Sequence, residues 1–225
     1  NGIQTTEGTS NVDGTWVQSV SPSPGTTSFT SVVATNLANQ LVIYGDSITA
    51  GGNATNLPYE GYPIVLRDAI SNPVTVEAWG YRTLYEDCNT AGLIDTFVAK
   101  LAAVSPTSIW LAIGTNDYAL NKQSAANFET MYAALLADLV VALPSTKIYC
   151  ASPVHRTSEV ANTFGDTTGD YRTAISNAVT TTADSDVTYV DTSAWLVDGD
   201  LDDGVHPTTA GHAIMASQIQ TALGL

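Results

Sequence analysis

The chain has 225 residues, 44% of them apolar, and a formal net charge of −15 from 7 basic and 22 acidic residues. That length supports one sizeable hydrophobic core without requiring a second domain. An acidic surface repels phosphate backbones and anionic lipid, so nucleic acid is not an expected partner, and no apolar run approaches the ~18 residues of a membrane span.

The first 38 residues differ in composition from the rest, because they are rich in Ser, Thr, Gly and Pro. Two short β-like runs, at 15–20 and 29–34, flank the turn sequence SPSPG. We therefore expect residues 1–38 to form a surface hairpin or an extended arm, and residues 39–225 to form one domain.

Five apolar, β-branched runs recur through the rest of the chain, and they begin at Leu41, Val74, Ser108, Lys147 and Val187. Segments with helical spacing lie between them: 93–104, 128–143 with Ser124 as its N-cap, and a closing helix at 209–223. Strands that alternate with helices in this way predict βαβ units and a parallel sheet covered on both faces. The expected fold class is α/β, a three-layer α/β/α sandwich.

Chemically useful residues follow the predicted strands. Ser47 follows the first strand, Asn116 the third, and Asp203 and His206 the fifth. Ligands of open parallel sheets bind at the carboxyl ends of the strands. A serine hydroxyl becomes a nucleophile when an imidazole takes its proton, and a carboxylate must orient that imidazole. The sequence therefore predicts Ser47 as nucleophile, His206 as general base and Asp203 as its partner.

The attack of a serine on a carbonyl also requires donors for the oxyanion that develops. The candidates are the backbone N–H groups of Ser47 and Gly80 and the side-chain amide of Asn116. A glycine at position 80 would let a substrate approach the backbone closely.

Four segments together resemble the blocks of the SGNH, or GDSL, hydrolase family over residues 41–225: GDSIT at 45–49, the glycine after the second strand, GTND at 114–117 and DGVHP at 203–207. The resemblance implies a flavodoxin-like, five-stranded parallel sheet and a Ser-His-Asp mechanism that needs no metal or other cofactor. The second block departs from the family's usual Asn-x-Gly-x-x-Gly pattern, because AWGYRT has Ala78 and Thr83 in place of the asparagine and the second glycine.

Other polar residues near the predicted strand ends are assigned structural roles. Asp46 and Asp117 are expected to organise backbone turns, His155 to lie at the rim of the cleft, and His212 to face elsewhere. The acidic run at 198–204 fails the EF-hand pattern, so no metal site is predicted there.

Aromatic residues gather in the loops after the strands, and we expect Tyr81, Arg82 and Tyr118 to contact substrate. The predicted function is a serine esterase of small carboxylic esters, with a carbohydrate deacetylase favoured and a small-molecule or glycan ester as substrate. A thioesterase or lysophospholipase-like hydrolase of longer acyl chains is the alternative. A non-catalytic glycan-binding module is the rival from another class.

Composition bears on the compartment as well. Low lysine, abundant threonine and alanine, and strong acidity indicate an exported bacterial protein or an excised domain, and we expect a secreted location. Cys88 and Cys150 are compatible with one disulfide or with two free thiols, and the sequence leaves both states open, as it does the oligomeric state.

Overall fold

The computed structural model describes residues 5–6, 19–20, 40–56, 59–70 and 72–225. Its centre is a parallel sheet of five strands: β3 (Leu41–Gly45), β4 (Val74–Ala78), β5 (Ser108–Ala112), β6 (Lys147–Ala151) and β7 (Val187–Val190). The spatial order is β4-β3-β5-β6-β7. This is the flavodoxin-like order, and each strand begins at the residue that the sequence predicts.

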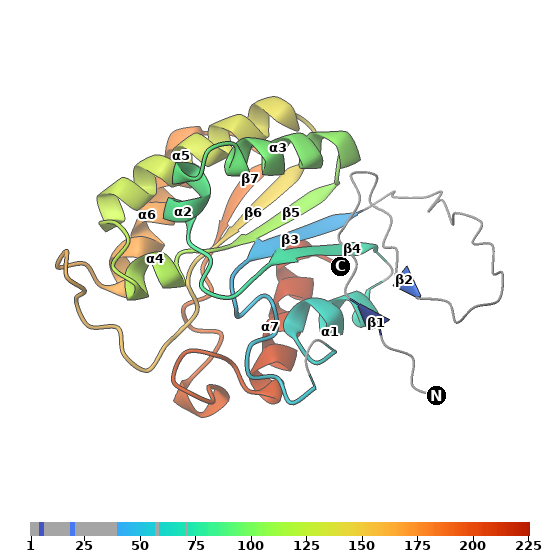
Figure 1. Ribbon diagram of the computed structural model, residues 1–225, viewed down its shortest axis with the longest axis vertical. Helices are drawn as coiled ribbons and strands as arrows, with labels where there is room; N and C mark the ends of the chain where they lie inside the picture. The colour runs from blue at the N-terminus through green and yellow to red at the C-terminus, as the bar shows by residue number, and fades with distance from the viewer. Residues whose placement is uncertain (1–4, 7–18, 21–39, 57–58, 71) are drawn as a thin grey trace.

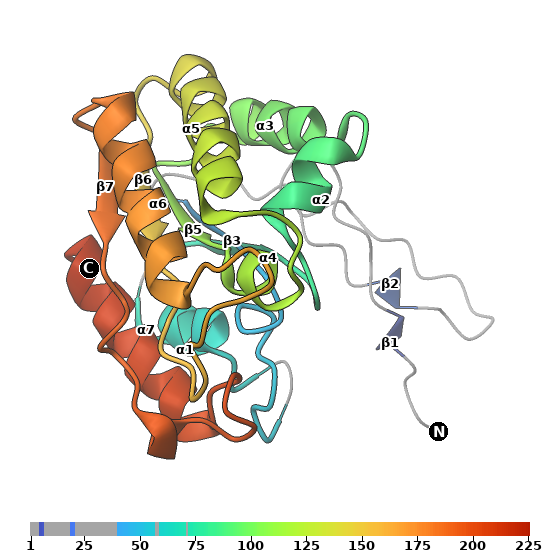
Figure 2. The ribbon, with the colours of Figure 1, turned by 90° about the vertical axis from the view of Figure 1, so that its left-hand side faces the viewer.

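Helices cover both faces of the sheet, so the predicted α/β/α sandwich is confirmed (Figure 1). Figure 2 shows two of them on the face opposite α3 and α5. These two are α1 (Tyr62–Ala69) and α7 (Thr209–Leu223). The other helices are α2 (Leu84–Asn89), α3 (Leu93–Val104), α4 (Thr115–Ala119), α5 (Ala125–Ala142) and α6 (Thr168–Thr182), and a short 3₁₀ turn, η1, spans Asp198–Asp200.

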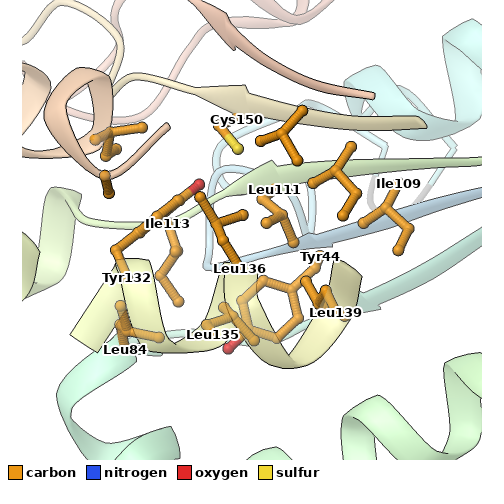
Figure 3. Packing of buried hydrophobic residues seen from close by; sticks show 14 of the residues in the cluster. Tyr44, Leu84, Ile109, Leu111, Ile113, Tyr132, Leu135, Leu136, Leu139 and Cys150 are labelled. Carbon is orange, nitrogen blue, oxygen red and sulfur yellow. The ribbon is translucent and has the colours of Figure 1, made fainter. Parts of the chain in front are cut away.

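The alternation of side chains along each strand divides the core into two clusters. Val42 and Tyr44 of β3 pack toward α3 and α5, whereas Leu41 and Ile43 pack toward α1 and α7. Successive strand residues point to opposite faces, so a strand buried on both faces is apolar throughout. Figure 3 shows the first cluster, in which Tyr132 and Leu136 of α5 lie against the sheet.

Helix α5 begins as the sequence predicts, because the Ser124 hydroxyl accepts a hydrogen bond from the Asn127 N–H at 3.3 Å. In the described part of the chain it is the one helix long and apolar enough to cross a membrane. Its buried residues, among them Phe128 and Leu139, belong to the first core cluster. We therefore interpret α5 as a core helix.

The N-terminal arm is described only in part. Strand β1 (Thr5–Thr6) pairs with β2 (Ser19–Val20) in antiparallel register. The predicted run at 29–34, and all of the run at 15–20 except Ser19–Val20, lie outside the described residues.

Both cysteines are free thiols. Cys150 is buried in β6 within the first core cluster, and Cys88 packs against the same cluster from α2. Burial raises the pKa of Cys88 to about 11 and that of Cys150 to about 12, which keeps both as unreactive thiols at neutral pH.

We expect dithiothreitol to leave the Tm unchanged, because the fold contains no disulfide that reduction could open. Thermal unfolding with and without the reductant, followed by circular dichroism, measures this. A lower Tm after reduction would show that a disulfide stabilises the protein.

Candidate active site

The order of the strands places the predicted site residues at one end of the sheet. Strand β3 lies between β4 and β5, and Gly45 at its end pairs in register with Ala78 of β4 and Ala112 of β5. The segments that follow these three strands therefore leave the sheet at the same level. This is the switch point of the sheet, where the connections from neighbouring strands run to opposite faces. The segments that follow carry Ser47 and Gly80 in loops and Asn116 in the short helix α4.

Ser47 sits in a tight turn directly after β3. The Asp46 carboxylate accepts a hydrogen bond from the Ile48 N–H at 3.0 Å, and the Asp46 carbonyl accepts one from the Ala50 N–H at 2.9 Å. The Gly52 N–H donates to the Ser47 carbonyl at 2.8 Å. Asp46 thus has the backbone role that the sequence predicts, and the turn presents Ser47, which is partly exposed, at the end of a buried strand.

The structure brings together Ser47, His206 and Asp203. Ser47 Oγ lies 2.9 Å from His206 Nε2, although the two residues are 159 positions apart in the sequence. His206 Nδ1 lies 2.7 Å from Asp203 Oδ2. The three side chains form one continuous hydrogen-bonded chain.

Asp203 is held by its own loop as well as by the imidazole. Its Oδ1 accepts hydrogen bonds from the N–H groups of Val205 at 3.0 Å and His206 at 2.8 Å. Partial burial acts to raise the pKa of Asp203, but the hydrogen bonds from His206 and Val205 outweigh it and hold that pKa well below its usual range. An ionised carboxylate accepts hydrogen bonds only, so Nδ1 of His206 carries the proton and Nε2 faces Ser47 as an acceptor.

Asn116 of helix α4 is bonded to the loop that carries Gly80. Asn116 Nδ2 donates to the Arg82 carbonyl at 3.1 Å, which leaves the second hydrogen of this amide uncommitted. Gly80 is exposed, and a Cβ at this position would meet no atom within 4 Å. The roles of Gly80, Asn116 and the Ser47 N–H in binding an oxyanion stay predictions.

Asp117 fixes the loop that follows Gly80. It is fully buried, and its two oxygens accept hydrogen bonds from the N–H groups of Leu84 and Tyr85, both at 3.0 Å. Burial raises the pKa of Asp117, and these hydrogen bonds oppose that shift. The structural role that the sequence assigns to Asp117 is confirmed.

Arg82, predicted as a substrate contact, is buried instead. Its side chain is 2% exposed, and its Nε lies 2.7 Å from Asp87 Oδ2 in an ion pair that is buried on both sides. The guanidinium lies between the rings of Tyr44 and Trp79, at 3.7 and 3.6 Å from their centroids. The prediction for Arg82 is wrong, because this guanidinium is enclosed by the core and has no exposed face for a substrate.

Tyr118 is also buried, although it was predicted to contact substrate. It is 5% exposed, its hydroxyl donates to the Val160 carbonyl at 2.6 Å, and its ring packs edge-on against Tyr171. It therefore anchors the loop between β6 and α6, which corrects the prediction. Tyr81, in contrast, is 76% exposed next to Gly80, and its substrate contact stays a prediction.

The two other histidines differ in exposure and in partners. His155 is partly exposed, with Nε2 2.8 Å from Asp198 Oδ1, and its position at the rim stays a prediction. His212 was expected to face elsewhere, and that expectation is wrong. Its Nε2 lies 3.0 Å from the Gly52 carbonyl, in the same turn that carries Ser47.

Gly52 is a site residue that the sequence analysis missed. A Cβ at this position would lie 2.8 Å from His206 Cδ2 and 3.4 Å from His206 Nε2. The glycine therefore makes room for the imidazole beside Ser47. The sequence contains a signal for this, since Gly51 and Gly52 directly follow the serine turn, but it does not show which of them lies against the histidine.

Two further features bear on what the site can bind. A cavity of about 30 Å³ lies beside it, lined mainly by apolar residues that include Ile48, Ile113, Val154 and Trp195. In the part of the chain that the structure describes, no group of three or more His, Cys, Asp or Glu side chains is arranged to hold a metal ion.

Asp46 makes the stability of the site depend on pH. Burial raises its pKa to about 6, above the value of about 3.9 for an unfolded chain. The folded protein then binds this proton more tightly than the unfolded chain does. The contribution of this proton to the stability of the protein is fully present below about pH 4 and is lost as the pH rises through about 6.

We expect Asp46→Asn, which keeps an acceptor for the Ile48 N–H, to raise the free energy of unfolding by up to about 3 kcal/mol at pH 8 and by little at pH 4. Urea unfolding of both proteins at the two pH values measures the difference. A gain that is the same at pH 4 and pH 8 would contradict the assignment of a raised pKa to Asp46.

Comparison with known proteins identifies relatives of this chain. The model of the GDSL-like lipase/acylhydrolase family matches residues 43–214. No curated protein matches the chain.

Solved structures share the fold at low identity. An acetyl esterase mutant with an acetate ion is 20% identical with a TM-score of 0.63, over 83% of this chain and 96% of that one. A carbohydrate esterase of family 3 from Talaromyces cellulolyticus has the same identity and coverage and a TM-score of 0.62. A salicylyl-acyltransferase of a tetracycline biosynthetic pathway is 19% identical with a TM-score of 0.68, over 85% of this chain and 56% of that one. At these identities the likeness concerns the fold alone.

Proposed function

The chain belongs to the GDSL-like lipase/acylhydrolase family, and from the geometry of its site we propose that it is a serine esterase that forms an acyl-enzyme on Ser47. The hydrogen-bonded chain from Ser47 through His206 to Asp203, at 2.9 and 2.7 Å, carries this proposal. A hydroxyl bonded to an imidazole that a carboxylate orients is the arrangement that makes serine a nucleophile.

In the first half of the reaction, Ser47 Oγ attacks the ester carbonyl carbon while its proton passes to His206 Nε2. Asp203 stabilises the resulting imidazolium through Nδ1–H. The oxyanion receives hydrogen bonds from the N–H groups of Ser47 and Gly80 and from the Asn116 amide. When the tetrahedral intermediate collapses, the bond to the leaving oxygen breaks, and that oxygen takes the proton from His206 and departs as an alcohol.

In the second half, His206 Nε2 takes a proton from a water molecule, whose oxygen attacks the acyl carbon bound to Ser47. Collapse of this second intermediate breaks the bond to Ser47 Oγ, which recovers its proton from His206. A carboxylic acid leaves, and the free enzyme is restored.

We propose a small acyl group, such as acetyl. The cavity flanks the Ser47 turn, because Asp46 and Ile48 line it, and its volume of about 30 Å³ suits a small group such as a methyl. This observation favours an acetyl esterase over the thioesterase or lysophospholipase-like alternative. The intact Ser47, His206 and Asp203 chain favours catalysis over a non-catalytic glycan-binding module.

We propose a carbohydrate as the alcohol half of the ester. Three aromatic side chains around Gly80 are exposed: Trp79 by 40%, Tyr81 by 76% and Tyr85 by 37%. Arg82 covers one face of the Trp79 ring at 3.6 Å and so holds its orientation. Flat aromatic faces suit the apolar faces of sugar rings.

The acyl-enzyme tests the proposed chemistry directly. The protein is mixed with p-nitrophenyl acetate, quenched in acid and digested, and the peptides are analysed by mass spectrometry. We expect one acetyl group on the peptide that contains Ser47 and none on the other serine peptides. Turnover of the ester without acetylation of Ser47 at any quench time would contradict the proposed intermediate.

We expect Tyr81→Ala to raise KM for an acetylated xylo-oligosaccharide about fivefold to tenfold, because about 1 kcal/mol of ring stacking is lost. The kcat/KM for p-nitrophenyl acetate should stay within about twofold, because that substrate carries no sugar. Val141→Ala is the matched control, since Val141 is exposed on the last turn of α5, before the amino end of β6. An unchanged KM for the oligosaccharide would remove Tyr81 from substrate binding.

A further inference from the structure

His212 lies on the second turn of α7, only six residues after His206, and it is completely buried. Both of its ring nitrogens have partners. Nε2 lies 3.0 Å from the Gly52 carbonyl, and Nδ1 lies 3.3 Å from the backbone nitrogen of Tyr62. Because an N–H points at Nδ1, this nitrogen must be the acceptor, so Nε2 carries the proton and donates to Gly52.

The surroundings of His212 favour its neutral form. Burial lowers its pKa, and the nearby charge of His206 acts in the same direction, against the hydrogen bond to Gly52. A neutral ring with both nitrogens satisfied is a fixed structural element rather than a proton carrier. The Nε2–H group of the neutral ring is therefore available to hold the Gly52 carbonyl.

Gly52 connects this donor to the reacting groups. Its N–H closes the turn onto the Ser47 carbonyl at 2.8 Å, and its Cα faces the edge of the His206 ring so closely that a Cβ would lie 2.8 Å from Cδ2. A displacement of Gly52 would therefore move both the turn that carries Ser47 and the surface against which His206 rests.

We propose that His212 is a positioning residue of the reaction, which holds Ser47 Oγ and His206 Nε2 in register through the Gly52 carbonyl. Helix α7 then helps to position both Ser47 and His206. Its N-terminus directly follows the loop that carries His206, and its second turn holds the loop that carries Ser47. This proposal rests on the proposed esterase function.

Two substitutions with side chains of nearly equal length separate the effect of the hydrogen bond from the effect of the ring's volume. His212→Gln keeps an N–H donor at the position of Nε2, whereas His212→Met fills similar space without a donor. Both lose the ring and the aromatic contact with Tyr62. We expect His212→Gln to keep kcat for p-nitrophenyl acetate within about threefold of wild type.

We expect His212→Met to lower kcat about 10-fold to 100-fold with KM unchanged, since a displacement of about 1 Å in a catalytic group costs up to that much. Urea unfolding of both variants identifies any loss of fold. Equal kcat values in the two variants would overturn the proposal, because packing alone would then explain the burial of His212.

A double-mutant cycle tests the path through Gly52. Gly52→Ala places a methyl group against His206 and should lower kcat by itself. If His212 acts through Gly52, His212→Met should lower kcat little further in the Gly52→Ala background. Fully additive losses would show that His212 acts by another route and would overturn the proposed path.

A spectroscopic measurement keeps this test independent of ester hydrolysis. His206 Nδ1 lies 2.7 Å from Asp203 Oδ2, and we expect the Nδ1–H proton to give a far-downfield ¹H NMR signal in the free protein. We expect His212→Gln to retain this signal and His212→Met to shift or broaden it. An unchanged signal in both variants would overturn the positioning role, whatever substrate the enzyme hydrolyses, whereas a wild-type protein with this signal and no esterase activity would contradict only the proposed function.

Discussion

Replacement of Ser47 by alanine should lower kcat for p-nitrophenyl acetate by at least about 10⁴-fold, with KM changed far less. The reason is that, among the residues that the structure describes, Ser47 carries the one hydroxyl bonded to the His206 imidazole, and its Oγ at 2.9 Å is the group whose proton Nε2 would take. The residual rate would come from water that His206 activates and from the oxyanion donors.

Ser217→Ala provides the control for Ser47→Ala, because Ser217 is exposed on α7 outside the site. Its kcat should match wild type. Steady-state hydrolysis of p-nitrophenyl acetate by the three proteins at equal concentration measures the effect. Equal rates for wild type and Ser47→Ala would end the serine-esterase proposal.

Asp203→Asn should lower kcat by about 10⁴-fold at pH 7, because it reverses the tautomer of His206. In the wild type, Oδ1 accepts from the N–H groups of Val205 and His206, and Oδ2 accepts from Nδ1–H. An asparagine has one oxygen, which the two backbone N–H groups retain, so its NH₂ group faces Nδ1. The imidazole must then carry its proton on Nε2, where it cannot accept the proton of Ser47.

Asp202→Asn is the matched control for Asp203→Asn, since Asp202 is an exposed neighbour in the same loop. It should keep kcat within about twofold. A small effect of Asp203→Asn, similar to that of Asp202→Asn, would show that the carboxylate does not orient His206.

The fold could be predicted from the sequence because its signals are local and repeated. Each strand is a short apolar run that begins at the expected residue, from Leu41 of β3 to Val187 of β7. The order of the strands came from the resemblance and not from these runs, because the runs do not show which strands become neighbours. The helices α3 and α7 occupy the predicted ranges for the same local reason, namely their 3.6-residue apolar spacing.

The roles of individual side chains were harder to predict, because the direction of a side chain depends on distant partners. Arg82 precedes a helix in a loop at the site, yet Asp87 and the Tyr44 ring from β3 draw its guanidinium into the core. His212 has no acidic neighbour in the sequence that would mark it as important. Its partners, Gly52 and Tyr62, come from segments 150 or more residues away.

The buried contacts of Asn116 and Asp117 have a consequence for how the proposed hydrolase would work. The Asn116 amide is bound to the Arg82 carbonyl, and Asp117 is bound to the N–H groups of Leu84 and Tyr85, so the chain itself supplies these partners. The dipoles that would face the developing negative charge are therefore oriented when the chain folds, so little reorganisation energy is required in each turnover. A site held in this way would discriminate among esters by the shape and position of the scissile bond rather than by closing around them.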